Sequence, residues 1–314
     1  MSQDAQASHG RTICVVGPTG SGKSEVADRV AERLGGAVIS VDAMQVYRGM
    51  DIGTAKTPPS SRRAPLLMVD VCDPGEGYSA QRFQHDARQV IDDLTCRGIV
   101  PVLCGGTGLY LDATIDELSL PEGSGGDARR KALERRAEVE GAQVLHDELE
   151  ARDPRSAALI HPHNVRRTIR AIELLDDGTS YAASYGSSRS HEPHYDARIW
   201  GLATDRQRLY DRIDARVDGM MASGLLDEVR TLGAHGLDRA PTASQAIGYK
   251  ELLEYLAGAC TLDEAVTRVK RRSRRYAKRQ LTWLRHDDRV RWIDMDVTDV
   301  GHAAETIVSD WKVG

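Results

Sequence analysis

The sequence predicts an α/β protein in which a parallel sheet is flanked by helices and interrupted by an inserted all-helical domain. Two observations favour the sheet: short β-branched apolar runs, and helix-like spacing of apolar residues between them. A third favours the insertion, because charged helical sequence replaces this rhythm from about Leu118 to Pro193. We therefore expect a core formed by residues 1–118 and 198–314, with residues 119–197 inserted into it.

Composition restricts the class of protein. A chain of 314 residues with 40% hydrophobic content can bury one large core or two smaller ones. No apolar leader and no window of roughly 18 apolar residues is present, so we expect a cytoplasmic protein without a membrane span. The five cysteines are odd in number and widely spaced, which indicates neither a disulfide framework nor a zinc module. A monomer is the default expectation.

The first predicted strand leads into a glycine-rich loop. Thr12–Val16 is a β-branched apolar run, and the next eight residues, GPTGSGKS, fit the pattern GxxxxGK[ST]. Val26, Val30 and Leu34 then follow at helical spacing. Strand, loop and helix come in the order that a phosphate-binding loop requires, so the core is predicted to be P-loop NTPase-like.

The residue types of this loop explain what it binds. Glycines let backbone amides turn around phosphate oxygens, and the following helix directs its positive dipole end at the anion. Lys23 adds a positive charge, and the Ser24 hydroxyl is expected on a Mg²⁺ ion that bridges two phosphates. The predicted diphosphate-binding residues are Gly17, Pro18, Thr19, Gly20, Ser21, Gly22, Lys23 and Ser24. Hydrolases, kinases and some transferases share such a loop, so it does not define the reaction.

A second buried-type strand, Ala37–Val41, ends at Asp42. Ligands of open α/β sheets bind beyond the carboxyl ends of strands, which places Asp42 close to whatever the loop holds. Its carboxylate could bind a metal through water, accept a proton or cap the next helix. Position alone leaves these three roles open.

Two further strand ends carry weaker signals. Ile99–Leu103 is a third apolar strand, and the pair Gly105 and Gly106 behind it is an ordinary tight turn on pattern alone. Asp70 follows the run Leu66–Val69 and could imitate a Walker B acid. We leave Asp70 out of the predicted site.

The insertion is predicted to contain two main helices behind a flexible joint at Pro121–Gly126. One helix is expected over Asp127–Arg152 and the other over Asn164–Asp176, where apolar residues recur at spacings of three and four. Opposite that apolar stripe, Arg166 and Arg170 lie one turn apart. On pattern alone such arginines form a solvated or salt-bridged face.

After the insertion the core pattern returns. Arg198–Leu202 is a predicted strand, and the helix after it turns Leu209 and Ile213 inward. Arg212 and Arg216 lie together elsewhere on that helix.

The last clear helix is strongly basic. It begins with a capping-box pattern at Thr261 and Glu264. Although the chain has a net charge of −5, there are nine Lys or Arg residues and no acid between Ala265 and Arg285. Like charges repel on one helix, so a polyanionic partner is the economical explanation. The alternative is neutralisation by acids elsewhere in the chain.

The motifs together resemble the tRNA dimethylallyltransferases, also called IPP transferases, from residue 13 to about 293. The segments that carry the resemblance are Gly17–Ser24, Ile39–Tyr47, Gly49–Lys56, Gly105–Tyr110, Gly248–Lys250 and Lys278–Trp283. One departure is Ala43, where many relatives carry serine. The family implies transfer of a dimethylallyl group from dimethylallyl diphosphate to the N6 amine of the adenosine immediately 3′ of a tRNA anticodon, with Mg²⁺ and release of diphosphate.

The resemblance also implies residue roles. Lys23 and the loop amides would stabilise the leaving group, and Asp42 would be the general base or amine-orienting carboxylate. Thr107 would position the reacting groups, and Arg216, in preference to Arg212, would meet the diphosphate. The implied contacts with the tRNA anticodon stem-loop are Asp42, Ala43, Met44, Gln45, Thr107, Arg129, Arg166, Arg167, Thr168, Ile169, Arg170, Gln245, Ala246, Ile247, Gly248, Tyr249 and Lys250.

Three other classes share part of this pattern. A small-molecule P-loop kinase and a nucleic-acid-binding switch protein both have the phosphate loop, and a prenyltransferase acting on free adenine nucleotides shares the core motifs. A free nucleotide requires neither the helical insertion nor the basic helix. These two features therefore favour the tRNA substrate.

Overall fold

The computed structural model describes residues 10–118, 120, 128–185 and 192–313. The chain divides into a core unit, Met1–Ile115 with Pro193–Gly314, and an inserted unit, Asp116–Glu192. These divisions lie a few residues before the positions expected from the sequence. The joint expected at Pro121–Gly126 lies outside the described residues.

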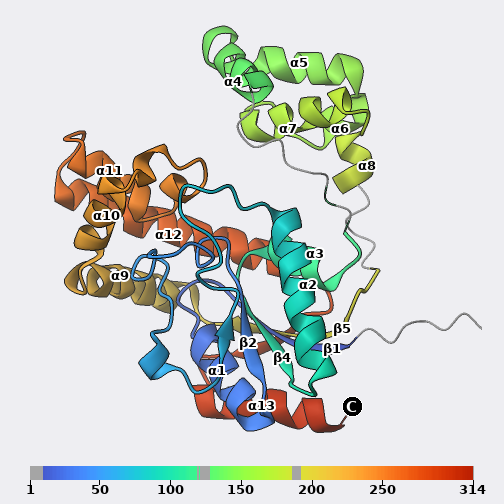
Figure 1. The fold of residues 1–314 in the computed structure, drawn as a ribbon, viewed down its shortest axis with the longest axis vertical. Helices are drawn as coiled ribbons and strands as arrows, with labels where there is room; N and C mark the ends of the chain where they lie inside the picture. Colours follow the sequence, from blue (N-terminus) through green and yellow to red (C-terminus); the bar gives the residue numbers. More distant parts are fainter. Residues whose placement is uncertain (1–9, 119, 121–127, 186–191, 314) are drawn as a thin grey trace, which may run out of the picture. The chain divides into compact units, whose positions relative to one another are not determined.

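The core unit contains a six-stranded sheet in the order β3-β2-β4-β1-β5-β6, in which every pair is parallel. Strands β1, β2, β4 and β5 are labelled in Figure 1. Val16 at the end of β1 pairs with Gly105 of β4 and with Gly201 of β5. The carboxyl ends of the central strands therefore meet at one edge of the sheet. The strands are β1 (Arg11–Val16), β2 (Ala37–Val41), β3 (Leu66–Leu67), β4 (Pro101–Gly105), β5 (Asp196–Ala203) and β6 (Arg291–Asp294).

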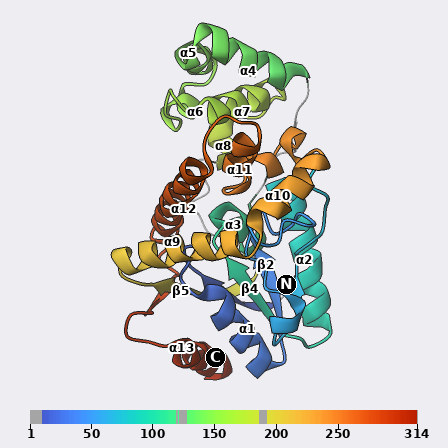
Figure 2. The same ribbon diagram turned by 90° about the vertical axis from the view of Figure 1, so that its left-hand side faces the viewer.

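Helices cover both faces of this sheet (Figure 2). Successive residues of a strand face opposite sides, so Ile13 and Val15 pack with α1 and α13 while Cys14 and Val16 pack with α2 and α3. The core helices are α1 (Lys23–Leu34), α2 (Ala80–Cys96), α3 (Gly108–Ile115), α9 (Arg206–Ala222), α10 (Leu225–Ala234), α11 (Tyr249–Leu256), α12 (Leu262–Leu284) and α13 (Val300–Val313). Short 3₁₀ turns are η1 (Pro59–Ser61), η2 (Leu237–Arg239) and η3 (Ala243–Gln245).

The inserted unit is helical and has an apolar cluster of its own, which includes Leu145 and Ile169. Its helices are α4 (Ala128–Glu140), α5 (Ala142–Arg152), α6 (Pro154–Ala158), α7 (Val165–Asp176) and α8 (Tyr181–Tyr185). The single helix expected over Asp127–Arg152 is wrong, because Gly141 adopts a φ of 95° and separates α4 from α5. The helix expected over Asn164–Asp176 is present, with Asn164 as its N-cap.

The two ends of the insertion are tied within each unit. In the core unit, the amides of His194 and Tyr195 donate to the Ile115 carbonyl oxygen, at 2.8 Å and 3.2 Å. In the inserted unit, the Glu117 amide donates to the Glu192 carbonyl oxygen at 2.8 Å. The chain therefore leaves and re-enters each unit at neighbouring points.

The described part of the chain contains no helix with the length and apolar character needed to cross a membrane.

Candidate phosphate and acceptor site

A cavity of about 470 Å³ opens in the core unit beyond the carboxyl ends of the strands. The phosphate loop, the turn after β2, the turn after β4 and helices α9 and α12 all contribute to its wall. Its polar lining includes Lys23, Ser24, Asp42, Thr107 and Arg216. Of the predicted diphosphate-binding residues, Thr19, Lys23 and Ser24 line the cavity, and they share it with the residues predicted to act on an amine.

The phosphate loop has the backbone geometry its glycines predict. Gly20 and Gly22 adopt φ angles of 83° and 89°, and α1 begins directly after Gly22. Lys23 Nζ donates to the Pro18 carbonyl oxygen at 3.3 Å. Burial lowers the pKa of Lys23, and the nearby Arg216 lowers it further. An anion in the cavity would offset this cost by stabilising both positive charges.

Asp42 organises the turn after β2. Its Oδ1 accepts hydrogen bonds from the amides of Met44 at 2.8 Å and Gln45 at 3.3 Å. No helix follows β2 directly in the described chain, so Asp42 does not cap a helix there. Its carboxylate instead stabilises the turn after β2. Thr107 Oγ1 accepts from the Ala43 amide at 3.3 Å, which joins the turns that follow β2 and β4.

Gly105 and Gly106 do more than form a tight turn. A Cβ atom at Gly105 would lie 2.0 Å from the Val41 carbonyl oxygen of the neighbouring strand. A Cβ atom at Gly106 would lie 2.1 Å from Nε2 of Gln280. Glycine at both positions lets β4 and α12 approach the site closely.

Gln280 of α12 is a site residue that sequence reasoning missed. Its Oε1 accepts from the Thr19 amide at 2.9 Å, and its Nε2 donates to the Gly106 carbonyl oxygen at 3.0 Å. The side chain is almost fully buried. Its partners lie 261 and 174 positions away in the chain, so a spacing argument cannot find them.

The structure separates the two arginines of α9. Arg216 lines the cavity and burial lowers its pKa, whereas Arg212 is exposed and does not line the cavity. Tyr276 of α12 also lines the cavity, and burial raises its pKa to about 12. Of the two arginines, only Arg216 is thus placed to meet a ligand in the cavity.

The segment before α11 also contributes to the cavity wall. Gln245, Ala246, Ile247 and Gly248 line the cavity, and Lys250 Nζ donates to Gln245 Oε1 at 3.2 Å.

Tyr249 lies differently from its neighbours. Its side chain has no exposed surface, and its hydroxyl donates to Glu228 Oε1 at 2.5 Å. The predicted tRNA contact by the Tyr249 side chain therefore needs correction, because burial in the core unit assigns it a packing role.

The predicted tRNA contacts of the inserted unit fall into two groups. Arg166 and Arg167 are exposed on α7. Thr168 and Ile169 have no exposed surface, so their side chains pack inside the unit and the predicted contact through them is wrong.

Two other arginines of this unit take part in ion pairs. Arg129 lies 3.1 Å from Asp177 and donates to the Glu173 carbonyl oxygen at 3.4 Å. Arg170 lies 3.5 Å from the buried carboxylate of Glu173. These arginines therefore have structural partners within the unit.

The basic residues of helix α12 differ in their surroundings; Arg279 lines the cavity and lies over the Tyr276 ring. Arg268, Lys270, Arg272 and Arg274 form ion pairs with Glu254, Asp218, Glu251 and Asp214. Neutralisation by acids elsewhere in the chain is thus the correct interpretation for these four. Arg271, Arg275 and Lys278 are exposed and have no ion-pair partner among the described residues; we call them the α12 stripe. The capping box predicted at Thr261 and Glu264 is present at the start of the helix.

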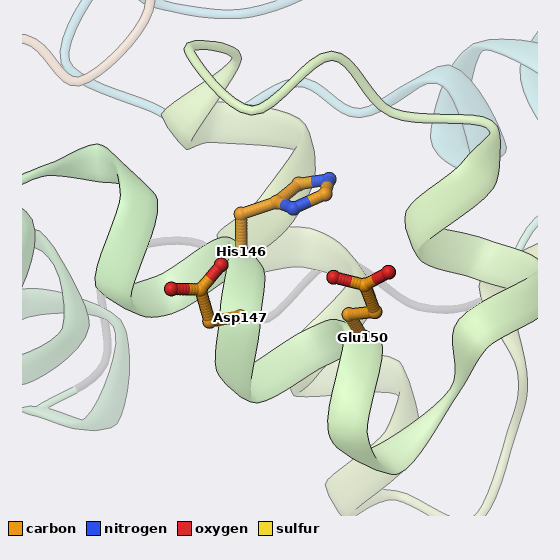
Figure 3. A group of neighbouring side chains, drawn as sticks. All are labelled: His146, Asp147 and Glu150. Carbon is orange, nitrogen blue, oxygen red and sulfur yellow. The ribbon is translucent and has the colours of Figure 1, made fainter.

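His146, Asp147 and Glu150 of α5 form a separate group whose potential metal-ligand atoms lie within 4.8 Å of one another (Figure 3). His146 Nε2 lies 2.9 Å from the Ile160 carbonyl oxygen, so Nε2 is the donor and Nδ1 carries the lone pair. The Nδ1 atom is buried and has no hydrogen-bond partner among the described residues, so a metal ion has no open approach to it. We assign the histidine a packing role in the inserted unit.

The fold and the cavity define an α/β protein whose glycine-rich loop and Asp42 lie at the carboxyl ends of parallel strands. The chain belongs to the IPP transferase family, whose model matches residues 45–287, and a model described as isopentenyl transferase matches residues 11–62. The predicted family and the predicted α/β fold are therefore confirmed.

Similar proteins share nearly the whole chain. The tRNA dimethylallyltransferase of Geobacillus kaustophilus is 45% identical over 298 residues, which cover 95% of this chain and 94% of that protein. The full-length tRNA isopentenylpyrophosphate transferase of Bacillus halodurans has a similar structure, with a TM-score of 0.71, 42% identity, and coverage of 97% of this chain and 96% of that one. A eukaryotic dimethylallyltransferase acting on tRNA gives a TM-score of 0.78 at 27% identity, over 96% of this chain and 80% of that one.

Proposed function

We propose that this protein transfers a dimethylallyl group from dimethylallyl diphosphate to the N6 amine of the adenosine immediately 3′ of a tRNA anticodon. The allylic C–O bond breaks and its electron pair leaves with diphosphate. The amine forms the new N–C bond and loses one proton, which the carboxylate of Asp42 accepts. The products are N6-(dimethylallyl)adenosine in tRNA and diphosphate.

One observation carries this proposal: a single cavity is lined by cations suited to a leaving diphosphate and by a carboxylate suited to an attacking amine. Lys23 and Arg216 supply positive charge where negative charge develops. Asp42 and Thr107 come from neighbouring strand ends, so the two turns hold them in fixed relation. Apolar side chains such as Ile213 and Val217 line the same cavity and suit a prenyl chain.

The residues present fit a magnesium ion. Ser24 lies in the first turn of α1 with its side chain exposed, and it lines the cavity beside Lys23. Mg²⁺ keeps several waters and binds substrate phosphates together with one or two protein oxygens, so this sparse set of donors suits it. The ion would neutralise charge on the departing diphosphate.

The basic surfaces suit the tRNA anticodon stem-loop. The α12 stripe lies on the core unit, and Arg166 and Arg167 lie on the inserted unit. Exposed cations without acidic partners are suited to RNA phosphates. We further propose that the protein acts in the cytoplasm, as a monomer.

The test is transfer of labelled prenyl from dimethylallyl diphosphate, with Mg²⁺, to unmodified tRNA and in parallel to AMP, ADP and ATP. Label in tRNA alone, abolished in Asp42→Ala, is the expected result. Label in free nucleotides would assign the protein to the nucleotide prenyltransferases. Label in neither acceptor would overturn the proposal and restore the kinase and switch alternatives.

A further inference from the structure

Glu228 of α10 binds three successive backbone amides. Its Oε2 accepts from the amides of Asp51 at 3.0 Å and Ile52 at 2.7 Å, and its Oε1 accepts from the Gly53 amide at 3.2 Å. The Tyr249 hydroxyl donates to the same Oε1 at 2.5 Å. Hydrogen bonds to an ionised carboxylate are stronger than neutral ones, so this one side chain fixes a whole turn.

The turn that Glu228 holds has little freedom. A Cβ atom at Gly53 would lie 2.5 Å from the ring of Tyr249, which itself has no exposed surface. Ala55 adopts a φ of 51°, a conformation unfavourable for a residue with a side chain. At the other end of the turn, Lys56 Nζ bonds the Tyr47 carbonyl oxygen at 2.6 Å. A strained turn of this kind persists only while its surroundings hold it.

A short chain of hydrogen bonds connects this turn to Asp42. The Thr54 carbonyl oxygen accepts from Gln45 Nε2 at 3.0 Å, and Gln45 Oε1 accepts from Ser40 Oγ at 2.7 Å. The Gln45 amide donates to Asp42 Oδ1 at 3.3 Å. The position of the turn therefore fixes Gln45, and Gln45 bonds the carboxylate that faces the cavity.

We propose that Glu228 is a positioning residue for the transfer reaction: it holds residues 51–54 in place and, through Gln45, orients the carboxylate of Asp42. This inference rests on the proposed role of Asp42. Glu228 does not line the cavity, so its effect on the reaction passes through the turn and not through contact with a substrate.

Two variants test the inference in the full-length enzyme. Glu228→Gln keeps the side-chain volume but replaces one acceptor oxygen with an NH₂ group that faces amide donors. Tyr249→Phe removes one hydroxyl and keeps the ring beneath Gly53. For Glu228→Gln we expect kcat to fall about tenfold or more while KM for dimethylallyl diphosphate changes by less than about twofold. Tyr249→Phe should change the same parameter by a smaller factor.

The matched control is Asp227→Asn, on the adjacent residue of α10. Asp227 is exposed and pairs with Arg230 on the surface of the same helix, so kcat and KM should stay at wild-type values. Thermal melting of each variant is measured alongside the rates. A Glu228→Gln protein that melts at the wild-type temperature and still has a reduced kcat supports a positioning role.

Combination with Asp42→Asn separates positioning from general structural damage. If Glu228 acts through the Asp42 carboxylate, its substitution should matter little once that carboxylate is gone. Adding Glu228→Gln to Asp42→Asn should then lower the residual rate by less than about twofold, so that the two effects do not multiply. Full multiplication of the two effects, or wild-type kcat in Glu228→Gln, would overturn the inference. Absence of prenyl transfer by the wild-type protein would instead overturn the proposed function.

Discussion

The Oε1 atom of Gln280 accepts a hydrogen bond from the backbone amide of Thr19, which ties helix α12 to the phosphate loop. The other end of the same side chain donates to the Gly106 carbonyl oxygen after β4. One neutral amide thus joins the loop that suits diphosphate to the turn that carries Thr107. A carboxylate cannot replace it, because it has no donor for the Gly106 oxygen.

Gln280→Glu should destabilise the core unit and weaken diphosphate binding. It leaves the buried Gly106 carbonyl facing an acceptor, at a cost of about 1–3 kcal/mol, and places negative charge beside the phosphate loop. The free energy of unfolding in urea and the affinity for inorganic diphosphate both check this. Thr282→Ala, at an exposed position one half-turn further along α12, should change neither quantity.

Asp42→Asn should reduce kcat by a factor of about 10² to 10⁴, the usual contribution of a positioned general base. Affinity for inorganic diphosphate should stay near the wild-type value, because the carboxylate acts on the amine. Single-turnover kinetics and calorimetry measure the two effects separately. If diphosphate affinity decreased by the same factor as kcat, Asp42 would act on the prenyl diphosphate and not on the amine.

Arg216→Met and Arg212→Met form a matched pair on α9. Only Arg216 lines the cavity, so Arg216→Met should weaken diphosphate binding about 10- to 100-fold, the range for a hydrogen bond to a charged group. Arg212→Met should leave the affinity unchanged. A similar decrease in Arg212→Met would show that the exposed arginine meets the leaving group.

Lys23 should take up protons when diphosphate binds. Burial lowers its pKa in the ligand-free protein, and a bound anion raises that pKa again. The contribution of Lys23 to diphosphate affinity should therefore be constant below the lowered pKa and decrease as the pH rises through it. Calorimetry in two alkaline buffers of different ionisation enthalpy measures the protons. Lys23→Met isolates the lysine, because titration of the ligand is common to both proteins.

The α12 stripe should control the salt dependence of tRNA binding. When Arg271, Arg275 and Lys278 are changed to glutamine, the plot of log association constant against log salt concentration should become less steep. The magnitude of its negative slope should decrease by roughly 0.7 to 0.9 for each RNA phosphate that is no longer neutralised. Arg268→Gln is the control, since Arg268 is engaged with Glu254. Equal slopes for the triple variant and wild type would place the RNA-binding surface elsewhere on the protein.

Local sequence signals predicted the elements that depend on neighbouring residues. The β-branched runs predicted β1 and β2, and the glycines at 20 and 22 predicted a loop whose φ angles only glycine adopts readily. The box at Thr261 and Glu264 predicted the start of α12, because both partners lie within one turn.

Features that depend on tertiary contact were missed. Strand β6 is an edge strand in which only Ile293 is buried, so it has no apolar run to detect. Gln280 and Thr19 are 261 positions apart, and Glu228 and Ile52 are 176 positions apart. Tyr249 is buried because its ring packs against Gly53. The motif Gly248–Lys250, which implied a tRNA contact, does not reveal this packing.

The hydrogen bonds at the two ends of the insertion affect the order in which the inserted unit and the core sheet fold. The insertion separates α3 from β5, which pairs with β1, and closing a free loop of about 75 residues costs on the order of 4 kcal/mol of entropy. When the inserted unit folds first, its Glu117–Glu192 hydrogen bond already holds the loop ends together. The insertion emerges from the ribosome before β5, so its folding shortens the search by which the central sheet is completed.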